Sequence, residues 1–236
     1  MLVILAAVLC SVVVGCKSDE QNVKLAASQD EQNTLKEEIS SMFPTSELTA
    51  SIVIDSVSEG DSVRAEQQVG KGTLLMIANG KEERGHLVVS STLGQEGDQT
   101  FQSNYSIIYQ QGEKEKVLLE LPAYLFVQPT DKKLIFEQLS FSDADVHILT
   151  PQYQTGHGVE GYVFAIDKTN GDAFHVNIVK NEGKSKTLLY GEASPFPTVK
   201  DDILQVYPPV GAGSSEKDTN KGYYKLDLKN SQLIAE

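Results

Sequence analysis

The stretch NYSIIYQQGEKEKVLL, residues 104–119, decides the fold, because a similar stretch, FHVNIVKNEGKSKTLL, recurs at residues 174–189. Each stretch places branched and aromatic residues on both sides of a polar segment that holds a glycine, Gly112 in the first and Gly183 in the second. Such flanks around a glycine-bearing turn favour a β-hairpin. Both stretches are therefore predicted to form hairpins of an all-β protein.

The similarity continues past the hairpins and predicts two four-stranded antiparallel units, at about residues 104–170 and 174–236. Each unit has its longest connection before its fourth strand, at residues 140–161 and 208–221. Because one such unit cannot bury its apolar face alone, repeated units are expected to pack together. The alternative is that two ordinary amphipathic hairpins are alike by chance.

A further pattern concerns the third and fourth strands of the first unit. Residues 128–136, QPTDKKLIF, and residues 162–167, YVFAID, resemble blades of TolB-type β-propellers, in which a Pro-Asp turn precedes a strand. A closed propeller needs roughly four to eight blades of about 40–50 residues each, and two longer units do not supply them. The predicted fold is therefore an all-β domain at residues 48–236, built as a β-sandwich or a partial propeller-like stack.

The N-terminal residues have the pattern of a targeting signal. Residues 1–15, MLVILAAVLCSVVVG, are uncharged and nearly all apolar, yet they are fewer than the about 20 residues that span a bilayer as a helix. This pattern is typical of the apolar region of a secretory signal peptide, although no Lys or Arg precedes it. The alternative is a buried apolar helix that ends in Gly-Cys.

The sequence Val13-Val14-Gly15-Cys16 resembles the lipobox of bacterial lipoproteins, in which the cysteine carries the lipid. The resemblance implies that Cys16 bears acyl chains such as palmitate and anchors the protein to the extracytoplasmic face of the cell membrane. Because Cys10 would leave with the signal peptide, the mature chain would have no free thiol, disulfide or thiolate metal site.

Two short segments separate this anchor from the β domain. Residues 16–33 are mostly polar and predict a flexible tether, because so little apolar surface cannot offset the entropy of ordering. In residues 34–47, apolar side chains recur at helical spacing after a Thr34 N-cap, and Pro44 ends the pattern. A short helix is predicted there. The acidic, polar tether favours a Gram-positive source.

Charge limits the classes of partner. The sequence has 33 acidic and 20 basic residues, which gives a formal net charge of −13. A surface of this sign repels nucleic acid and anionic lipid headgroups, so no nucleic-acid partner is predicted. A protein, a small molecule or a glycan remains as the expected partner.

The sequence lacks the common catalytic and metal-binding motifs. The sequence has no Gly-x-Ser-x-Gly elbow, Walker loop, His-Glu-x-x-His pair or Cys-x-x-Cys motif. The EF-hand spacing is not met near Asp143 and Asp145 or near Asp167. No metal site and no cofactor are predicted. His157 lies between two glycines, so its side chain can reach a ligand. Asp143, Asp145 and His157 are therefore the candidate ligand-binding residues of the first long connection.

These observations favour a non-catalytic binding or interaction module that is anchored through Cys16. The two long connections form the expected contact surface, because equivalent loops of repeated units lie on the same side. The alternative is a secreted cell-envelope hydrolase whose carboxyl groups are drawn from Asp143, Asp145, Asp201 or Asp202. A third hypothesis is that the protein is a purely structural component of the cell envelope.

Overall fold

The hairpin predicted at residues 104–119 is present, and its first strand lies at the centre of a sheet. The computed structural model describes residues 39–44, 49–181, 183–210 and 221–236. The hairpin consists of β5 (Gln99–Gln111) and β6 (Lys114–Gln128). Its turn contains Gly112, whose φ of 60° lies in the left-handed region that glycine adopts without strain.

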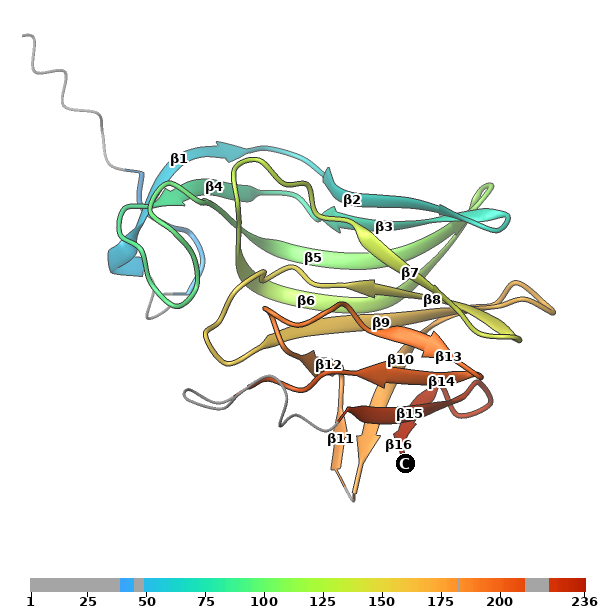
Figure 1. Ribbon diagram of the computed structural model, residues 1–236. Helices are drawn as coiled ribbons and strands as arrows, with labels where there is room; N and C mark the ends of the chain where they lie inside the picture. The colour runs from blue at the N-terminus through green and yellow to red at the C-terminus, as the bar shows by residue number, and fades with distance from the viewer. Residues whose placement is uncertain (1–38, 45–48, 182, 211–220) are drawn as a thin grey trace, which may run out of the picture. The chain divides into compact units, whose positions relative to one another are not determined.

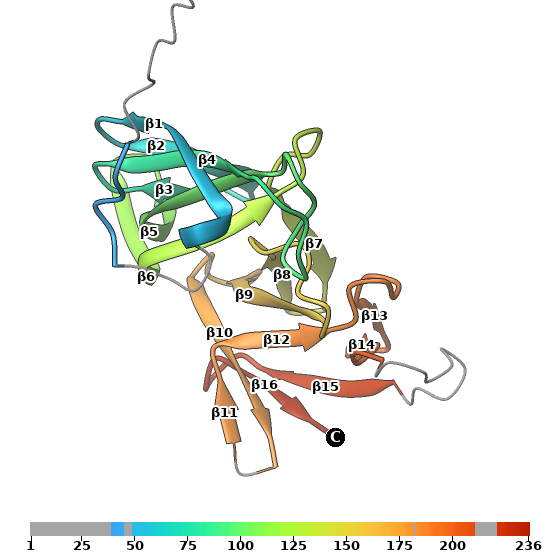
Figure 2. The same ribbon diagram turned by 90° about the vertical axis from the view of Figure 1, so that its left-hand side faces the viewer.

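Six strands form this first sheet. The others are β1 (Ile52–Ser58), β2 (Ser62–Val69), β3 (Gly72–Ala78) and β4 (Glu82–Leu87). The order is β1-β4-β5-β3-β2, with β6 also paired to β5. Because β4 pairs with the first part of β5 and β3 with the last part, β4 and β3 follow one another along one edge of β5. The sheet curls into a half-barrel (Figures 1 and 2).

Ten strands form the second sheet. They are β7 (Phe136–Ser140), β8 (Ala144–Leu149), β9 (Val159–Asp167), β10 (Ala173–Lys180), β11 (Gly183–Ser185), β12 (Thr187–Tyr190), β13 (Thr198–Lys200), β14 (Ile203–Val206), β15 (Gly222–Asp227) and β16 (Gln232–Ala235). The order is β13-β14-β15-β16-β10-β9-β8-β7, and β11 and β12 pair with β10 and β9. Only β10 and β16 pair in parallel among the described strands. This sheet also curls and is barrel-like.

The second predicted hairpin is present but shorter than the first. β10 and β11 pair only from Lys180 and Gly183 to Ile178 and Ser185. Gly183 begins β11, and the left-handed φ falls on Asn181 instead, a residue type that tolerates this region. Beyond β11 the chain leaves β10, and β12 pairs with β9. Similar sequences therefore both form hairpins, but in different sheet contexts.

The all-β class is confirmed, and the strands of the predicted units are distributed over both sheets. In the first unit, β5 and β6 belong to the first sheet, whereas β7 and β9 belong to the second. One predicted connection was wrong in part, because residues 140–161 contain a further strand, β8. In β8, Asp145 and His147 alternate with buried apolar residues. These two polar residues are the reason that the segment was predicted as a loop and not as a strand.

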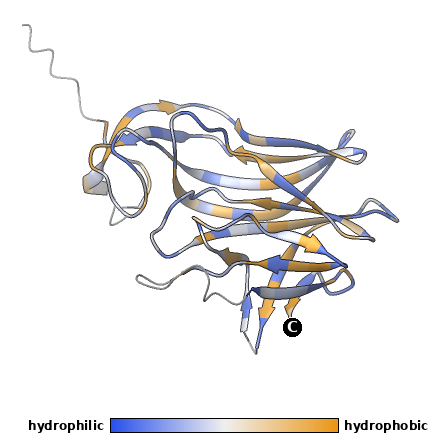
Figure 3. Ribbon diagram, viewed as in Figure 1, coloured by the Kyte–Doolittle hydropathy of each residue, from blue (hydrophilic) through white to orange (hydrophobic). Residues whose placement is uncertain are grey.

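Hydrophobic and hydrophilic residues alternate along many strands (Figure 3), and the buried hydrophobic side chains form two cores. In β9, Tyr162 and Phe164 belong to a core that also contains Leu74 and Tyr105 of the first sheet. Side chains at the intervening positions belong to a second core, which is built from the second sheet and its connections. Successive residues of a strand point to opposite faces, so β9 is buried on both. This explains its nearly continuous apolar sequence.

Most of the N-terminal predictions, namely the signal peptide, Cys16 and the tether, lie outside the described residues. Residues 39–44, the described part of the helix predicted at 34–47, form no helix. Ser41 Oγ and Met42 N instead donate hydrogen bonds to the carboxylate of Glu83 on β4, at 2.8 and 2.5 Å. A 3₁₀ turn, η1 (Thr49–Ser51), precedes β1.

Candidate ligand-binding site

A cavity of about 610 Å³ lies on the second sheet, beside the β10–β11 hairpin. Strands β9, β10, β12, β14 and β15 contribute to its wall. Its apolar floor is formed by Ile178, Leu189, Val206, Pro208, Pro209 and Tyr224. Leu189 has 49% of its surface exposed, which is unusual for a leucine in the middle of a strand. The volume lies in the range of small-molecule sites.

Charged residues surround this floor. Lys180, Lys184 and Lys221 line the cavity together with one carboxylate, that of Glu160. The Glu160 carboxylate accepts a hydrogen bond from Thr187 Oγ1 at 2.9 Å. The wall is thus locally basic, although the whole chain has a formal net charge of −13. This combination suits a ligand that has an apolar body and an anionic or hydrogen-bond-accepting group.

Both long connections reach this cavity. The connection at residues 140–161 contributes Glu160 near its end, and the connection at 208–221 contributes Pro208, Pro209 and Lys221. Residues 211–220 of the second connection lie outside the described part of the chain. The cavity therefore touches both segments in which the sequence predicted a contact surface.

Asp143 and Asp145 lie together at the start of β8. Asp143 is exposed, and its carbonyl oxygen accepts a hydrogen bond from Lys168 N at 2.9 Å. Asp145 belongs to the strand itself and accepts a hydrogen bond from Ser140 Oγ at 2.8 Å. Its Oδ1 atom also pairs with Lys168 Nζ at 3.3 Å. Neither aspartate lines the 610 Å³ cavity.

His157, the third candidate, is far from these aspartates along the β8–β9 pair. The strands are antiparallel, with Ala144 opposite Asp167 and Leu149 opposite Tyr162. His157 precedes the start of β9, so it lies near the end of β8 rather than near its beginning. The residue is exposed, and its backbone N–H donates to Thr155 Oγ1 at 3.1 Å. The structure brings the two aspartates together and leaves the histidine apart.

Asp201 and Asp202 form the turn between β13 and β14, with φ values of 53° and 58°. Two successive left-handed residues match a type I′ hairpin turn. Asp202 Oδ1 accepts a hydrogen bond from Ser142 N at 2.7 Å, which brings it close to Asp143. Hydrogen bonding to Ser142 holds the pKa of Asp202 below its ordinary value. Glycoside cleavage requires one carboxyl group with a raised pKa, so Asp202 does not fit the role of the acid.

The other three histidines have structural surroundings of different kinds. His86 Nδ1 lies 2.8 Å from Asp55 Oδ2, and His175 Nε2 lies 2.9 Å from the carbonyl oxygen of Lys186. His147 is fully buried between β7 and β9. Among the described residues, no three His, Cys, Asp or Glu side chains are grouped so that they could hold a metal ion.

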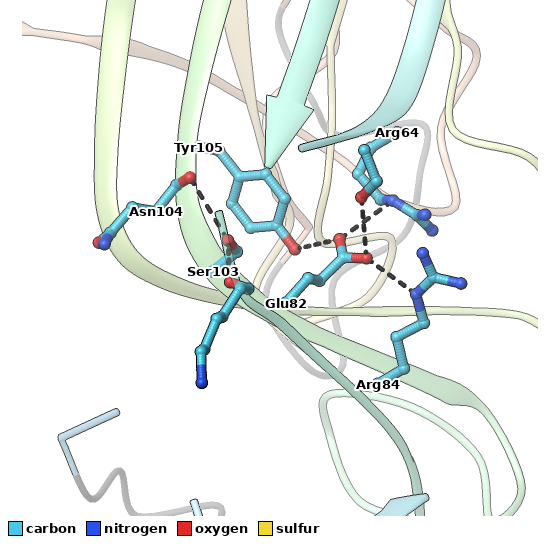
Figure 4. A network of polar contacts seen from close by, with 8 residues as sticks. Arg64, Glu82, Arg84, Ser103, Asn104 and Tyr105 are labelled. Atoms are coloured by element: carbon cyan, nitrogen blue, oxygen red, sulfur yellow. Dashed lines mark hydrogen bonds and ion pairs between the residues drawn. The ribbon is translucent and has the colours of Figure 1, made fainter. Parts of the chain in front are cut away.

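A buried carboxylate that holds two arginines was missed by sequence reasoning (Figure 4). Glu82, at the start of β4, has no exposed surface. Its Oε2 accepts from Arg84 Nε at 2.8 Å, and its Oε1 accepts from Tyr105 OH at 2.9 Å and lies 3.0 Å from Arg64 Nε. Burial, and then the charge of Glu82, raise the pKa of Tyr105, which stays a donor. One signal was available: the sequence contains only these two arginines.

Comparison of the chain with protein-family models, with curated proteins and with solved structures found no match. Within the described residues, no helix has both the length and the apolar character needed to cross a membrane. Support for a function therefore comes from the arrangement of side chains around the cavities of the domain.

Proposed function

We propose that the protein is a membrane-anchored extracytoplasmic lipoprotein whose all-β domain binds a ligand without chemical turnover. The observation that carries the binding role is the 610 Å³ cavity, with its apolar floor and lysine-lined wall. Cavities of this size that combine apolar lining with a few polar groups are the usual form of a small-molecule site. The anchoring role rests on the lipobox-like residues 13–16.

The lining of the cavity favours an amphipathic ligand. Leu189 and Tyr224 offer apolar surface to its body, and removing such surface from water is worth about 25 cal/mol per Å². Lys180, Lys184 and Lys221 offer N–H donors and positive charge to an acidic or hydroxyl-rich group. A glycan or peptide fragment with an acidic substituent, or a fatty acid, has this character.

A glutamate in place of Leu189 is expected to weaken ligand binding by about tenfold or more, because it puts a charge where the ligand body packs. The assay is a thermal-shift panel of fatty acids, glycans and muropeptides, in which a ligand at a hundred times its Kd adds about 2.7 kcal/mol to stability. Val117→Glu is the matched control, since Val117 is 51% exposed on β6 of the other sheet.

Two results would contradict this assignment. Equal shifts for the wild type and Leu189→Glu would place the ligand outside the cavity. Sustained turnover of a glycan or peptide that is lost in Asp143→Asn would replace the binding role with the hydrolase alternative.

The anchor has its own test. Cys16→Ser is expected to abolish labelling of the protein by a palmitate analogue in cells and to move it from the membrane fraction to the soluble fraction. Stable anchoring requires about two acyl chains, and the Cys16 residue is their proposed attachment point. Cys10→Ser is the matched control, because Cys10 lies in the apolar run ahead of the lipobox and is expected to keep both properties. Membrane-bound, labelled Cys16→Ser would contradict lipidation at this residue.

A further inference from the structure

Two β-bulges direct polar side chains into one cleft on the first sheet. The pairing of β2 with β3 shifts at Arg64, and the pairing of β1 with β4 shifts at Asp55, so neither residue has a partner in register. A bulge turns a side chain away from its regular direction and is common beside functional sites. Two separate bulges that serve the same cleft point to a binding role for it.

The cleft has a volume of about 480 Å³ and is lined by residues of β1, β2, β4 and β5. The side chains that matter here are Asp55, Arg64, Arg84, His86 and Phe101. The side chain of Arg64 is 18% exposed and that of Arg84 is 38% exposed. The guanidinium carbon of Arg64 also lies 5.0 Å from the centroid of the Phe101 ring. Both arginines are thus held by the protein while part of each side chain stays accessible.

The hydrogen-bonding groups of the two arginines are only partly used. Each guanidinium has five N–H donors in a planar fork. Both Nε atoms face Glu82, and the Arg64 Nε–H, although 3.0 Å from the carboxylate, has no well-directed acceptor in the described part of the chain. In that same part, no hydrogen bond or ion pair reaches the terminal nitrogens of either arginine (Figure 4). Two positive charges share a single buried negative charge.

We propose that this cleft binds a carboxylate or phosphate group of a ligand through the terminal N–H groups of Arg64 and Arg84. Guanidinium forks match both kinds of oxyanion with paired, charge-assisted hydrogen bonds. The cleft is larger than one such group, so the anion belongs to a larger molecule that also contacts the Phe101 side. Glu82 is a positioning residue that fixes the two forks from behind. This site is separate from the cavity on the second sheet and does not depend on the proposed function.

Asp55 supplies a control within the cleft itself. Its carboxylate lies 2.8 Å from His86 Nδ1 and is 51% exposed. A negative charge at this place opposes the binding of an anion. Removing it is therefore expected to have the opposite effect to removing an arginine.

The first experiment is an NMR titration of the full chain, in detergent micelles, labelled with ¹⁵N only at arginine. Because the sequence has only two arginines, the side-chain spectrum contains signals from Arg64 and Arg84 alone. Phenyl phosphate and phenylacetate, added at constant ionic strength, are expected to shift both sets of signals in a saturable manner, and sodium chloride is not. The probe that saturates at the lower concentration identifies phosphate or carboxylate as the preferred group.

Three variants complete the test. Arg84→Gln is expected to weaken probe binding, read on the Arg64 signal, by about tenfold, and Asp55→Asn is expected to tighten it severalfold. Lys81→Gln removes a cation that is paired with the exposed Glu59 and is expected to change nothing. Partial unfolding cannot produce effects of opposite sign. Absence of saturable shifts with both probes, or equal weakening by Lys81→Gln, would overturn the proposal.

Discussion

Replacing Glu82 with glutamine is expected to lower the free energy of unfolding by about 3–5 kcal/mol, the usual cost of removing one partner from a buried ion pair. The carboxylate has no exposed surface and is contacted by Arg64, Arg84 and Tyr105. Glutamine has the same shape, but its amide group carries N–H donors where the carboxylate only accepts. An amide N–H donor would then face the N–H and O–H donors of Arg84 and Tyr105. Urea denaturation at neutral pH measures the loss, provided that the m-value is unchanged.

Glu59→Gln is the matched control, because Glu59 pairs with Lys81 at 3.0 Å on the surface, with side chains 72% and 51% exposed. An exposed pair of this kind is worth about 1 kcal/mol or less. A triple variant that replaces Glu82 by leucine and both arginines by methionine is expected to recover much of the loss, since no charge is then buried alone. A loss below about 1 kcal/mol in Glu82→Gln would show that the network does not hold the strands together.

The network explains a limit of the sequence reasoning. Glu82 begins β4, Arg64 lies in β2 and Tyr105 lies in β5, and β2 and β4 are not neighbours in the sheet. Their side chains meet because β3 and β4 lie end to end along β5, so that the start of β2, which pairs with the end of β3, comes beside the start of β4. Several strand pairs set this arrangement together. The scarcity of arginine marked two residues as unusual. Nothing in the local pattern indicated which of the 33 acidic residues would join them.

The hairpins, in contrast, were predicted because they are local. β5 and β6 are consecutive and pair along nearly their whole length around Gly112, so period-two alternation and a turn residue are enough to identify them. The order of strands in the second sheet needs more information. The parallel pairing of β10 with β16 and the transfer of β12 to β9 join segments that are separate in sequence. These pairings follow from the packing of two cores.

In the candidate site, too, local features were predicted from the sequence and features that depend on the fold were not. Asp143 and Asp145 were predicted because they are acidic residues in an expected loop, and in the structure both contact Lys168. The cavity was not visible in the sequence, because Leu189, Val206 and Tyr224 look like ordinary core residues of strands. Leu189 becomes distinctive only when its exposure is known.

Acidification from pH 7 to pH 4 is expected to lower the free energy of unfolding by about 3 kcal/mol through His147 alone, since a change of one in pKa corresponds to about 1.4 kcal/mol. The His147 ring is fully buried, and neither of its nitrogens has a hydrogen-bond partner among the described residues. Burial lowers its pKa to about 4, against a smaller opposing effect of Asp145. The unfolded chain, whose histidines titrate near about 6.5, takes up a proton that the folded protein excludes. Stability from this residue is complete above about pH 6.5 and is lost as the pH falls to about 4.

The test compares the wild type with His147→Leu by urea denaturation at several pH values between about 4 and 7.5, the window set by the two pKa values. Leucine is expected to be tolerated, because Leu149 on the same strand face and the facing Phe164 are core residues, and to remove most of the pH dependence. Burial also lowers the pKa of His175. Its effect on the pH dependence of stability is the same in the wild type and in His147→Leu, so it cancels when the two profiles are subtracted. His157→Leu alters an exposed residue and is expected to keep the wild-type profile. Parallel profiles for the wild type and His147→Leu would mean that the folded protein accommodates the charged ring between its sheets, so that burial at this position imposes no penalty on protonation.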